Sequence, residues 1–307
     1  MTLTAFGYLF LRVDRHALLQ AFARVSLAAW LSAFALTVAA VGCGLVRWWL
    51  LFHAFGAVRP PRLAQLAEHY MAGLFYNTYL PGGLSGDVVR GLATQPAFEP
   101  GSAGAFATVI VERALGLAAL LALVASAMFS HALPGSAHQR LLVLGACGVG
   151  LAALVALTQV RRLLRFFPSK LRSLCERVPA PHAWGPLWLA LLLSCGSQLA
   201  PALCGHVLLH SMYSRITLQN SLVIVPLATA SAFLPISISG AGVRENVFVA
   251  LFASVGVPEQ DALAASLSLW GVQALLAGLC GLYVLLRSTP LTLAAQHDPG
   301  QPTRAKP

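Results

Sequence analysis

The sequence predicts an all-α polytopic membrane protein, and its composition, its long apolar runs and two broken apolar segments all support this class. Of the 307 residues, 58% are hydrophobic and only 10% are charged, whereas about a quarter of the residues in a typical soluble domain are charged. The formal net charge is +10. A membrane protein gains such an excess from Arg and Lys in its cytoplasmic loops. We therefore expect no nucleic-acid partner.

Five apolar runs are long enough to cross a bilayer, since about 20 helical residues at 1.5 Å each span its hydrocarbon core. The first run ends in Arg47, Trp48 and Trp49, a combination typical of an interfacial anchor. After the last run, the tail 288–307 is rich in Pro, Thr and Gln, and we expect it to be disordered and cytoplasmic. The predicted spans are 26–51, 103–129, 141–160, 187–213 and 262–286.

Two further apolar segments, 62–91 and 217–256, are broken near the middle by Pro and Gly clusters. Backbone broken in this way lies at membrane depth only where it faces protein or a water-filled cavity, so we predict two re-entrant hairpins. The loop 161–182 is strongly basic, which predicts that it is cytoplasmic. The first hairpin then enters from the cytoplasm and the second from the opposite face. Residues 1–13 are expected to be the remnant of a longer first helix.

An internal repeat relates these segments. Residues 80–90 read LPGGLSGDVVR and residues 234–244, 154 positions later, read LPISISGAGVR, with six of eleven positions identical. We interpret 21–130 and 183–287 as inverted repeats, joined by the helix 141–160 and the basic cytoplasmic loop 161–182. The alternative is a chance similarity of two kinks in a biased composition.

Proline and glycine give the repeated segments their predicted shape. Pro81 and Pro235 lack an amide hydrogen and should end their helices. Gly86 and Gly242 allow a positive φ or a close backbone approach. We expect the chain to restart as a helix whose free amides favour an anion.

Ionisable residues at membrane depth are the candidate site, because each costs about 2.5–3.5 kcal/mol at the bilayer centre on insertion-based scales. We interpret Arg90 and Arg244 as clamps that meet near the symmetry axis and bind a lipid phosphate through bidentate guanidinium groups. The alternative is that the charged residues form internal ion pairs that fasten the hairpins without a ligand. The other members of the candidate substrate site are Asn77, Ser85, Asp87, Glu112, Arg113, Ser237, Ser239 and Glu245.

We expect no metal site and no cofactor. His206 and His210 are four residues apart, but no third ligand lies near them in the sequence, and the cysteines include no CxxC pair. A GxxxxGK[ST] loop for nucleotide phosphates is absent from the sequence.

Four stretches of the chain resemble a family of flippase-like membrane proteins that includes the transmembrane part of bacterial lysylphosphatidylglycerol synthases. The stretches are RWWLLFHAFG, FYNTYLPGGLSGDVVRG, VERALGL and LPISISGAGVRENVFVALFASVGV. The resemblance covers about 21–287, with 1–287 as one flippase-like transmembrane domain. Ser85 and Ser239 stand where the family pattern usually has Gly. The matching positions are Asn77, Pro81, Gly82, Gly86, Asp87 and Arg90, and later Pro235, Ser237, Gly240, Gly242, Arg244 and Glu245.

The resemblance implies a multi-pass protein of the bacterial cytoplasmic (inner) membrane that moves a polar or anionic lipid between leaflets. The lipid could be a phospholipid, a polyprenyl-linked lipid or a hopanoid. The soluble aminoacyl-transfer domain of the full synthases has no counterpart in this sequence, so we expect a transporter and not an enzyme. The alternatives are a membrane transferase or hydrolase that uses Asp87 or Glu112 as a base, and a non-catalytic partner of lipid-synthesis enzymes.

Overall fold

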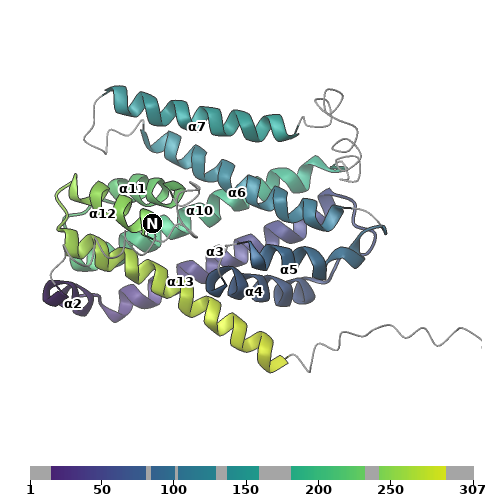
Figure 1. The fold of residues 1–307 in the computed structure, drawn as a ribbon, viewed down its shortest axis with the longest axis horizontal. Coiled ribbons are helices and arrows are strands. Elements are labelled where there is room, and N and C mark those ends of the chain that lie inside the picture. Colours follow the sequence, from purple (N-terminus) through teal and green to yellow (C-terminus); the bar gives the residue numbers. More distant parts are fainter. Residues whose placement is uncertain are drawn as a thin grey trace, which may run out of the picture.

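The computed structural model describes residues 15–80, 84–100, 103–128, 137–158, 181–231 and 242–287. These ranges contain helices joined by loops and no β-strand (Figure 1). The helices are α2 (Arg15–Ala23), α3 (Leu27–Ala54), α4 (Leu63–Tyr79), α5 (Ser85–Ala93), η1 (Gln95–Ala97), α6 (Gly104–Met128), α7 (Ala137–Thr158), α10 (Trp184–Met212), α11 (Leu218–Ser231), α12 (Val243–Ala253) and α13 (Glu259–Arg287).

Four of the described helices are long and apolar enough to cross a membrane. They correspond to four of the predicted runs and comprise Leu27–Ala54, Gly104–Ser126, Trp184–Met212 and Glu259–Arg287. The predicted span 141–160 lies mostly in α7, whose described apolar part is the shorter stretch Leu141–Ala152. The N-terminal residues 1–14, most of the basic loop and the tail 288–307 lie outside the described residues.

Helices α3 and α10 make the most extensive contact between any two described helices, and they run antiparallel through the middle of the molecule (Figure 1). Near one end, the amide of His182, just before α10, donates to the carbonyl of Ala54 at 2.7 Å. Near the other end, the Cys204 thiol donates to the carbonyl of Ala33 at 3.7 Å. The last residues of α3 therefore face the first residues of α10.

Each of these helices is followed by a pair of short helices that pack against each other, α4 with α5 and α11 with α12. Helix α4 ends at Tyr79, two residues before Pro81, as the proline predicts. A Cβ added to Gly86 would lie 2.0 Å from the carbonyl oxygen of Gly73. Glycine at position 86 thus allows the close helix approach that we predicted.

The two groups of helices, α3 to α6 and α10 to α13, pack by matching contacts. Helix α4 packs on α13 and α11 packs on α6; likewise α13 packs on α3 and α6 on α10. Leu218 begins α11 155 residues after Leu63 begins α4, and Glu259 begins α13 155 residues after Gly104 begins α6. These intervals are close to the 154-residue offset of the repeated segments.

The two helix pairs begin and end at opposite ends of the bundle. At one end, the amide of Arg59 donates to the carbonyl of Ala97 at 3.1 Å, and Arg287 lies 3.6 Å from Glu68 near the start of α4. At the other end, Arg24 donates to the Met212 carbonyl at 3.2 Å and pairs with Asp261 at the start of α13. Helix α11 follows Met212 and α12 precedes Asp261, so this pair belongs to the second end.

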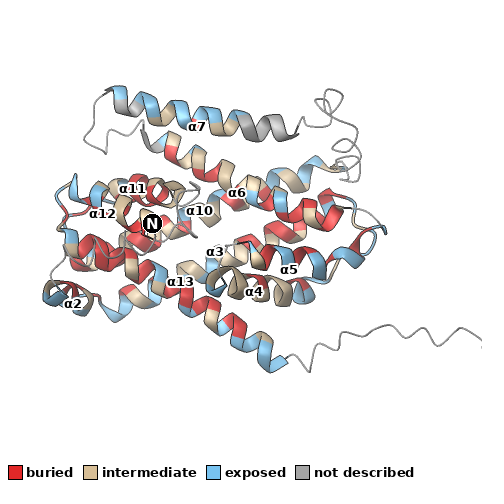
Figure 2. Cartoon of the chain, in the orientation of Figure 1, coloured by how far each residue is buried: buried red, intermediate tan, exposed pale blue. Residues whose placement is uncertain are grey.

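The long helices carry many exposed residues (Figure 2), and large apolar side chains are common among them. Exposed examples are Leu31 in α3, Ile110 in α6, Leu192 in α10 and Leu285 in α13. A soluble monomer seldom exposes so much contiguous apolar surface. These faces therefore fit contact with lipid, and the protein is a membrane protein with several spans.

The Gly86 contact yields a stability prediction. In Gly86→Ala the new methyl group meets the backbone of α4, so we expect a loss of about 1–3 kcal/mol in the free energy of unfolding. Gly271→Ala is the matched control, because a Cβ at this position in α13 meets no atom within 4 Å. The control should be neutral or stabilising by up to about 1 kcal/mol. Thermal unfolding of the purified protein in detergent measures both, and equal midpoints would contradict the close approach.

Candidate functional site

Five ionisable side chains from α3, α5 and α6 form a charged cluster beside the α4 and α5 pair. At its centre, Glu112 Oε1 accepts from Arg47 at 2.9 Å and Oε2 accepts from Arg90. Glu112 is only 2% exposed, and Arg47 and Arg90 are 8% and 6% exposed. The cluster comprises Arg47, Asp87, Arg90, Glu112 and Arg113.

Arg90 is held by aromatic rings as well as by charge. Its guanidinium carbon lies 4.0 Å from the ring centroid of Trp48 and 4.5 Å from that of Tyr70, a cation–π arrangement that is strongest when desolvated. A Cβ at Gly73 would lie 2.4 Å from Arg90 Cδ, so this glycine makes room for the arginine. Arg90 therefore fastens α5 to α3, α4 and α6.

Arg47 extends the cluster to the second group of helices. Its NH1 group donates to Ser194 Oγ at 3.1 Å and to Ser197 Oγ at 3.2 Å, both on α10. The prediction that Arg47 and Trp48 anchor the chain at an interface is wrong, because both are buried and Trp48 Nε1 donates to Thr108 Oγ1 at 3.2 Å. The helix bounds indicate that Arg47 and Glu112 lie at a similar depth. Arg47 lies seven residues before the end of α3, and Glu112 lies eight residues after the start of α6.

Asp87 and Asn77 join the end of α4 to the start of α5. Asp87 accepts from Asn77 Nδ2 at 3.1 Å and from Arg113 Nε, and its Oδ1 lies 3.8 Å from Arg90. Asn77 Oδ1 accepts from the amide of Gly86 at 2.9 Å. The Ser85 hydroxyl donates to the carbonyl of Tyr76 at 3.0 Å.

The first amides of α5 are consequently not directed at a ligand, contrary to our expectation. The amide of Gly86 is bonded to Asn77, and those of Asp87 and Val88 donate to the carbonyl of Leu84, each at 3.1 Å. The polar side chain of Asn77 takes the place that we assigned to an anion.

Arg244, the second predicted clamp, pairs with its neighbour Glu245 on α12. Arg244 donates to Glu245 Oε1 through Nε at 3.1 Å and NH2 at 2.6 Å. Glu245 Oε2 accepts from the amide of Gly242 at 2.6 Å, and Gly242 has the predicted positive φ, 88°. The predicted site residues Ser237 and Ser239 lie outside the described residues.

The structure does not bring Arg90 and Arg244 together. Helix α5 packs on α4 and α6, whereas α12 packs on α11 and α13, and the two helices lie on opposite sides of the molecule (Figure 1). Our expectation that these arginines meet at a symmetry axis is therefore wrong for this structure. The contacts of Arg90 agree with the alternative, an internal ion pair that fastens the helix pair.

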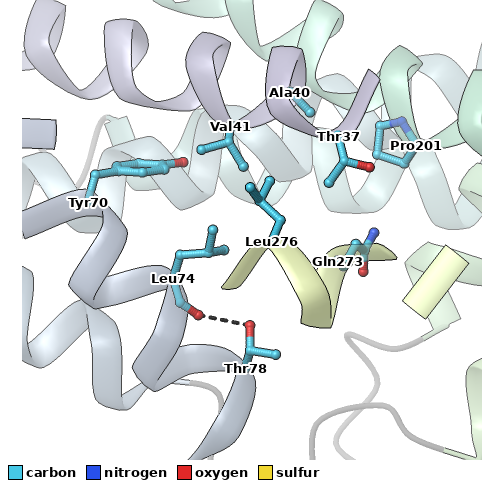
Figure 3. Close-up of a pocket in the computed structure, with 9 residues that line it drawn as sticks. All are labelled: Thr37, Ala40, Val41, Tyr70, Leu74, Thr78, Pro201, Gln273 and Leu276. Atoms are coloured by element: carbon cyan, nitrogen blue, oxygen red, sulfur yellow. Dashed lines mark hydrogen bonds between the residues drawn. The ribbon is translucent and has the colours of Figure 1, made fainter. Parts of the chain in front are cut away.

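A cavity of about 220 Å³ lies beside the cluster, between α3, α4, α10 and α13 (Figure 3). Tyr70 separates the two features, because its ring lines the cavity and also contacts the guanidinium of Arg90. Thr37, Thr78 and Gln273 are further polar residues in the lining. Sequence reasoning did not single out any of these residues, since each is one polar position in an apolar helix.

Within the described ranges, no three His, Cys, Asp or Glu residues come together as a metal site. His206 and His210 have ring centroids 5.4 Å apart, and His206 Nδ1 lies 3.0 Å from Ser221 Oγ. The described cluster is thus built from guanidinium and carboxylate groups that bind each other, and its guanidinium groups can also bind other anions.

The spans, the short helix pairs and the buried charges define a polytopic helical membrane protein with a cluster of buried ion pairs between its helices. The family model described as lysylphosphatidylglycerol synthase TM region matches residues 2–292. The chain belongs to this family, as the resemblance of its motifs predicted. No curated protein matches the chain.

The charged cluster yields a second stability prediction. Glu112→Gln removes the carboxylate that pairs with the buried Arg47 and leaves the buried Arg90 only the more distant Asp87, at 3.8 Å, so we expect a loss of about 3 kcal/mol or more in unfolding free energy. Glu68→Gln is the matched control, because Glu68 is 47% exposed and pairs with Arg287 only at 3.6 Å. That change should cost less than about 1 kcal/mol. Denaturant unfolding in detergent compares the two, and a Glu112 variant as stable as the control would contradict the central role of this carboxylate.

Proposed function

We propose that the protein is a lipid translocator that moves a polar or anionic lipid between the leaflets of the bacterial cytoplasmic membrane. The observation that carries this proposal is the charged cluster of three arginines and two carboxylates, of which all but the exposed Arg113 are buried among helices of membrane-spanning length. Such charges are expensive at membrane depth and normally mark a substrate or ion pathway. Membership of the lysylphosphatidylglycerol synthase TM family favours a lipid as the substrate.

We further propose that the two helix groups are inverted repeats and that each short helix pair is a re-entrant hairpin. The antiparallel packing of α3 and α10, the matching helix contacts and the opposite positions of the two pairs support this interpretation. In transporters of this kind, one repeat rocks against the other around a central site. The cargo candidates are phospholipids, polyprenyl-linked lipids and hopanoids.

The accessible end of the cluster is where a lipid headgroup would first bind. The side chain of Arg113 is 42% exposed, whereas that of its partner Asp87 is 10% exposed. A phosphate can replace a carboxylate on a guanidinium group, because both offer oxygens with matching geometry. Arg90 is buried and becomes available only if α5 moves. Arg244, with 20% of its side chain exposed, would receive the headgroup at the other hairpin.

This mechanism removes the main barrier to crossing, the transfer of a charged headgroup through hydrocarbon. The arginines supply counter-charges, and Asp87, Glu112 and Glu245 neutralise them when no lipid is bound. The acyl chains stay in the surrounding lipid. The translocator converts no substrate, in contrast to a transferase or hydrolase that would use Asp87 or Glu112 as a base.

Translocation is tested with the purified chain in liposomes that contain fluorescent phosphatidylglycerol, with quencher added outside. Arg113→Gln should lower the rate of leaflet exchange about tenfold or more, because a charge-assisted hydrogen bond to phosphate is lost. Arg287→Gln is the control, since Arg287 is 66% exposed and lies at the end of α13.

Three outcomes would contradict the proposal. Exchange no faster than in empty liposomes would favour a partner of lipid-synthesis enzymes. An Arg113 variant that is folded and fully active would remove the cluster from the pathway. Chemical change of the labelled lipid, detected by chromatography, would support the enzyme alternative.

A further inference from the structure

The cavity between the two helix groups has the size of a subsite. Helices α3 and α4 line one side and α10 and α13 the other (Figure 3). Its volume of about 220 Å³ exceeds the space of several water molecules and falls below the roughly 300–1,000 Å³ of pockets for drug-sized ligands. The cavity therefore suits one part of a larger molecule.

The lining excludes an ionised group. It contains apolar side chains, two threonines, one tyrosine and one glutamine, and no charged residue. An ionised phosphate or ammonium group without a partner is strongly disfavoured in such surroundings. The chemistry of this cavity thus differs from that of the charged cluster next to it.

Two polar groups in the lining lack a hydrogen-bond partner within the described part of the chain. Thr37 and Thr78 donate to the carbonyls of Ala33 and Leu74 in their own helices, each at 2.8 Å. The Tyr70 hydroxyl and the Gln273 amide have no such bond, although both residues line the cavity (Figure 3). A phenol and a primary amide together offer donors and acceptors for the uncharged polar groups of one ligand.

We propose that this cavity binds an uncharged, hydroxyl-bearing part of a membrane lipid, with Tyr70 and Gln273 as its hydrogen-bonding partners. The identity of the ligand as a lipid rests on the proposed function, whereas its neutrality follows from the lining. The ligand hydroxyl donates to Gln273 Oε1, and another oxygen of the same ligand accepts from the Tyr70 hydroxyl. The apolar lining contacts the adjoining hydrocarbon.

The place of Tyr70 explains why a neutral subsite lies beside a charged one. One face of its ring contacts the Arg90 guanidinium at 4.5 Å, and the same residue lines the cavity. Its hydroxyl lies against α3, where a Cβ at Gly44 would be only 2.1 Å from it. A lipid with its phosphate at the cluster and a hydroxyl of its headgroup in the cavity would contact both sides of this residue.

Photolabelling tests the subsite with the full chain in nanodiscs. The probe is a diacylglycerol with a diazirine on one acyl chain, compared with the same lipid in which the free hydroxyl is replaced by hydrogen. We expect the hydroxyl-bearing probe to label peptides of α4 and α13 about fivefold more strongly. Gln273→Leu and Tyr70→Phe should each reduce that labelling by a similar factor. Phenylalanine keeps the ring on Arg90, so this variant tests the hydroxyl alone.

Gln20→Leu on the exposed face of α2 is the matched control, and thermal unfolding verifies that each variant is folded. Equal labelling by both probes, or unchanged labelling of the two variants, would overturn the subsite in favour of bound water or an acyl chain. Stronger labelling by diazirine phosphatidic acid would also overturn it.

If labelling behaves as expected while liposomes show no exchange, the translocation proposal fails and the subsite stands. If liposomes show exchange but neither variant changes the labelling, the subsite proposal fails and the translocation proposal stands.

Discussion

The bridge that Glu112 makes between Arg47 and Arg90 is the interaction on which the arrangement of the first helix group depends. Through one carboxylate, α6 is joined to the core helix α3 and to the short helix α5. Arg47 carries the connection onward to Ser194 and Ser197 of α10. Hydrophobic contact cannot specify such an arrangement in a bilayer, because lipid tails are as apolar as the helix surfaces. A buried ionic link with defined geometry can specify which helices pack together.

The fold was largely predictable from the sequence because bilayer thickness sets the length of an apolar run. Four spans lie where hydropathy places them, and α4 stops where Pro81 requires. The partners of the charged residues were harder to predict. Whether Arg47 faces lipid or protein depends on the rotation of α3 about its axis, and the neighbouring tryptophans favoured the wrong orientation. Glu112 alone could not reveal that it has two arginine partners.

The repeated segments also led to a false expectation about symmetry. Arg90 and Arg244 occupy equivalent positions in LPGGLSGDVVR and LPISISGAGVR, yet their surroundings differ. At the same 154-residue offset, Ser266 stands opposite Glu112 and Pro201 stands opposite Arg47. Arg244 instead pairs with its neighbour Glu245. Similar backbone packing therefore carries a dense ionic network in one helix group and a local ion pair in the other.

Pro201 lies within α10 and lines the cavity. Because proline has no amide hydrogen, the carbonyl of Ser197 loses its usual partner one turn later, and the helix is mechanically weakest at this level. Arg47 donates hydrogen bonds to Ser194 and Ser197, which lie one to two turns before Pro201. A bend at Pro201 would therefore displace the C-terminal part of α10 while Arg47 holds the N-terminal part, and the cavity would change shape with the Arg47 contacts intact.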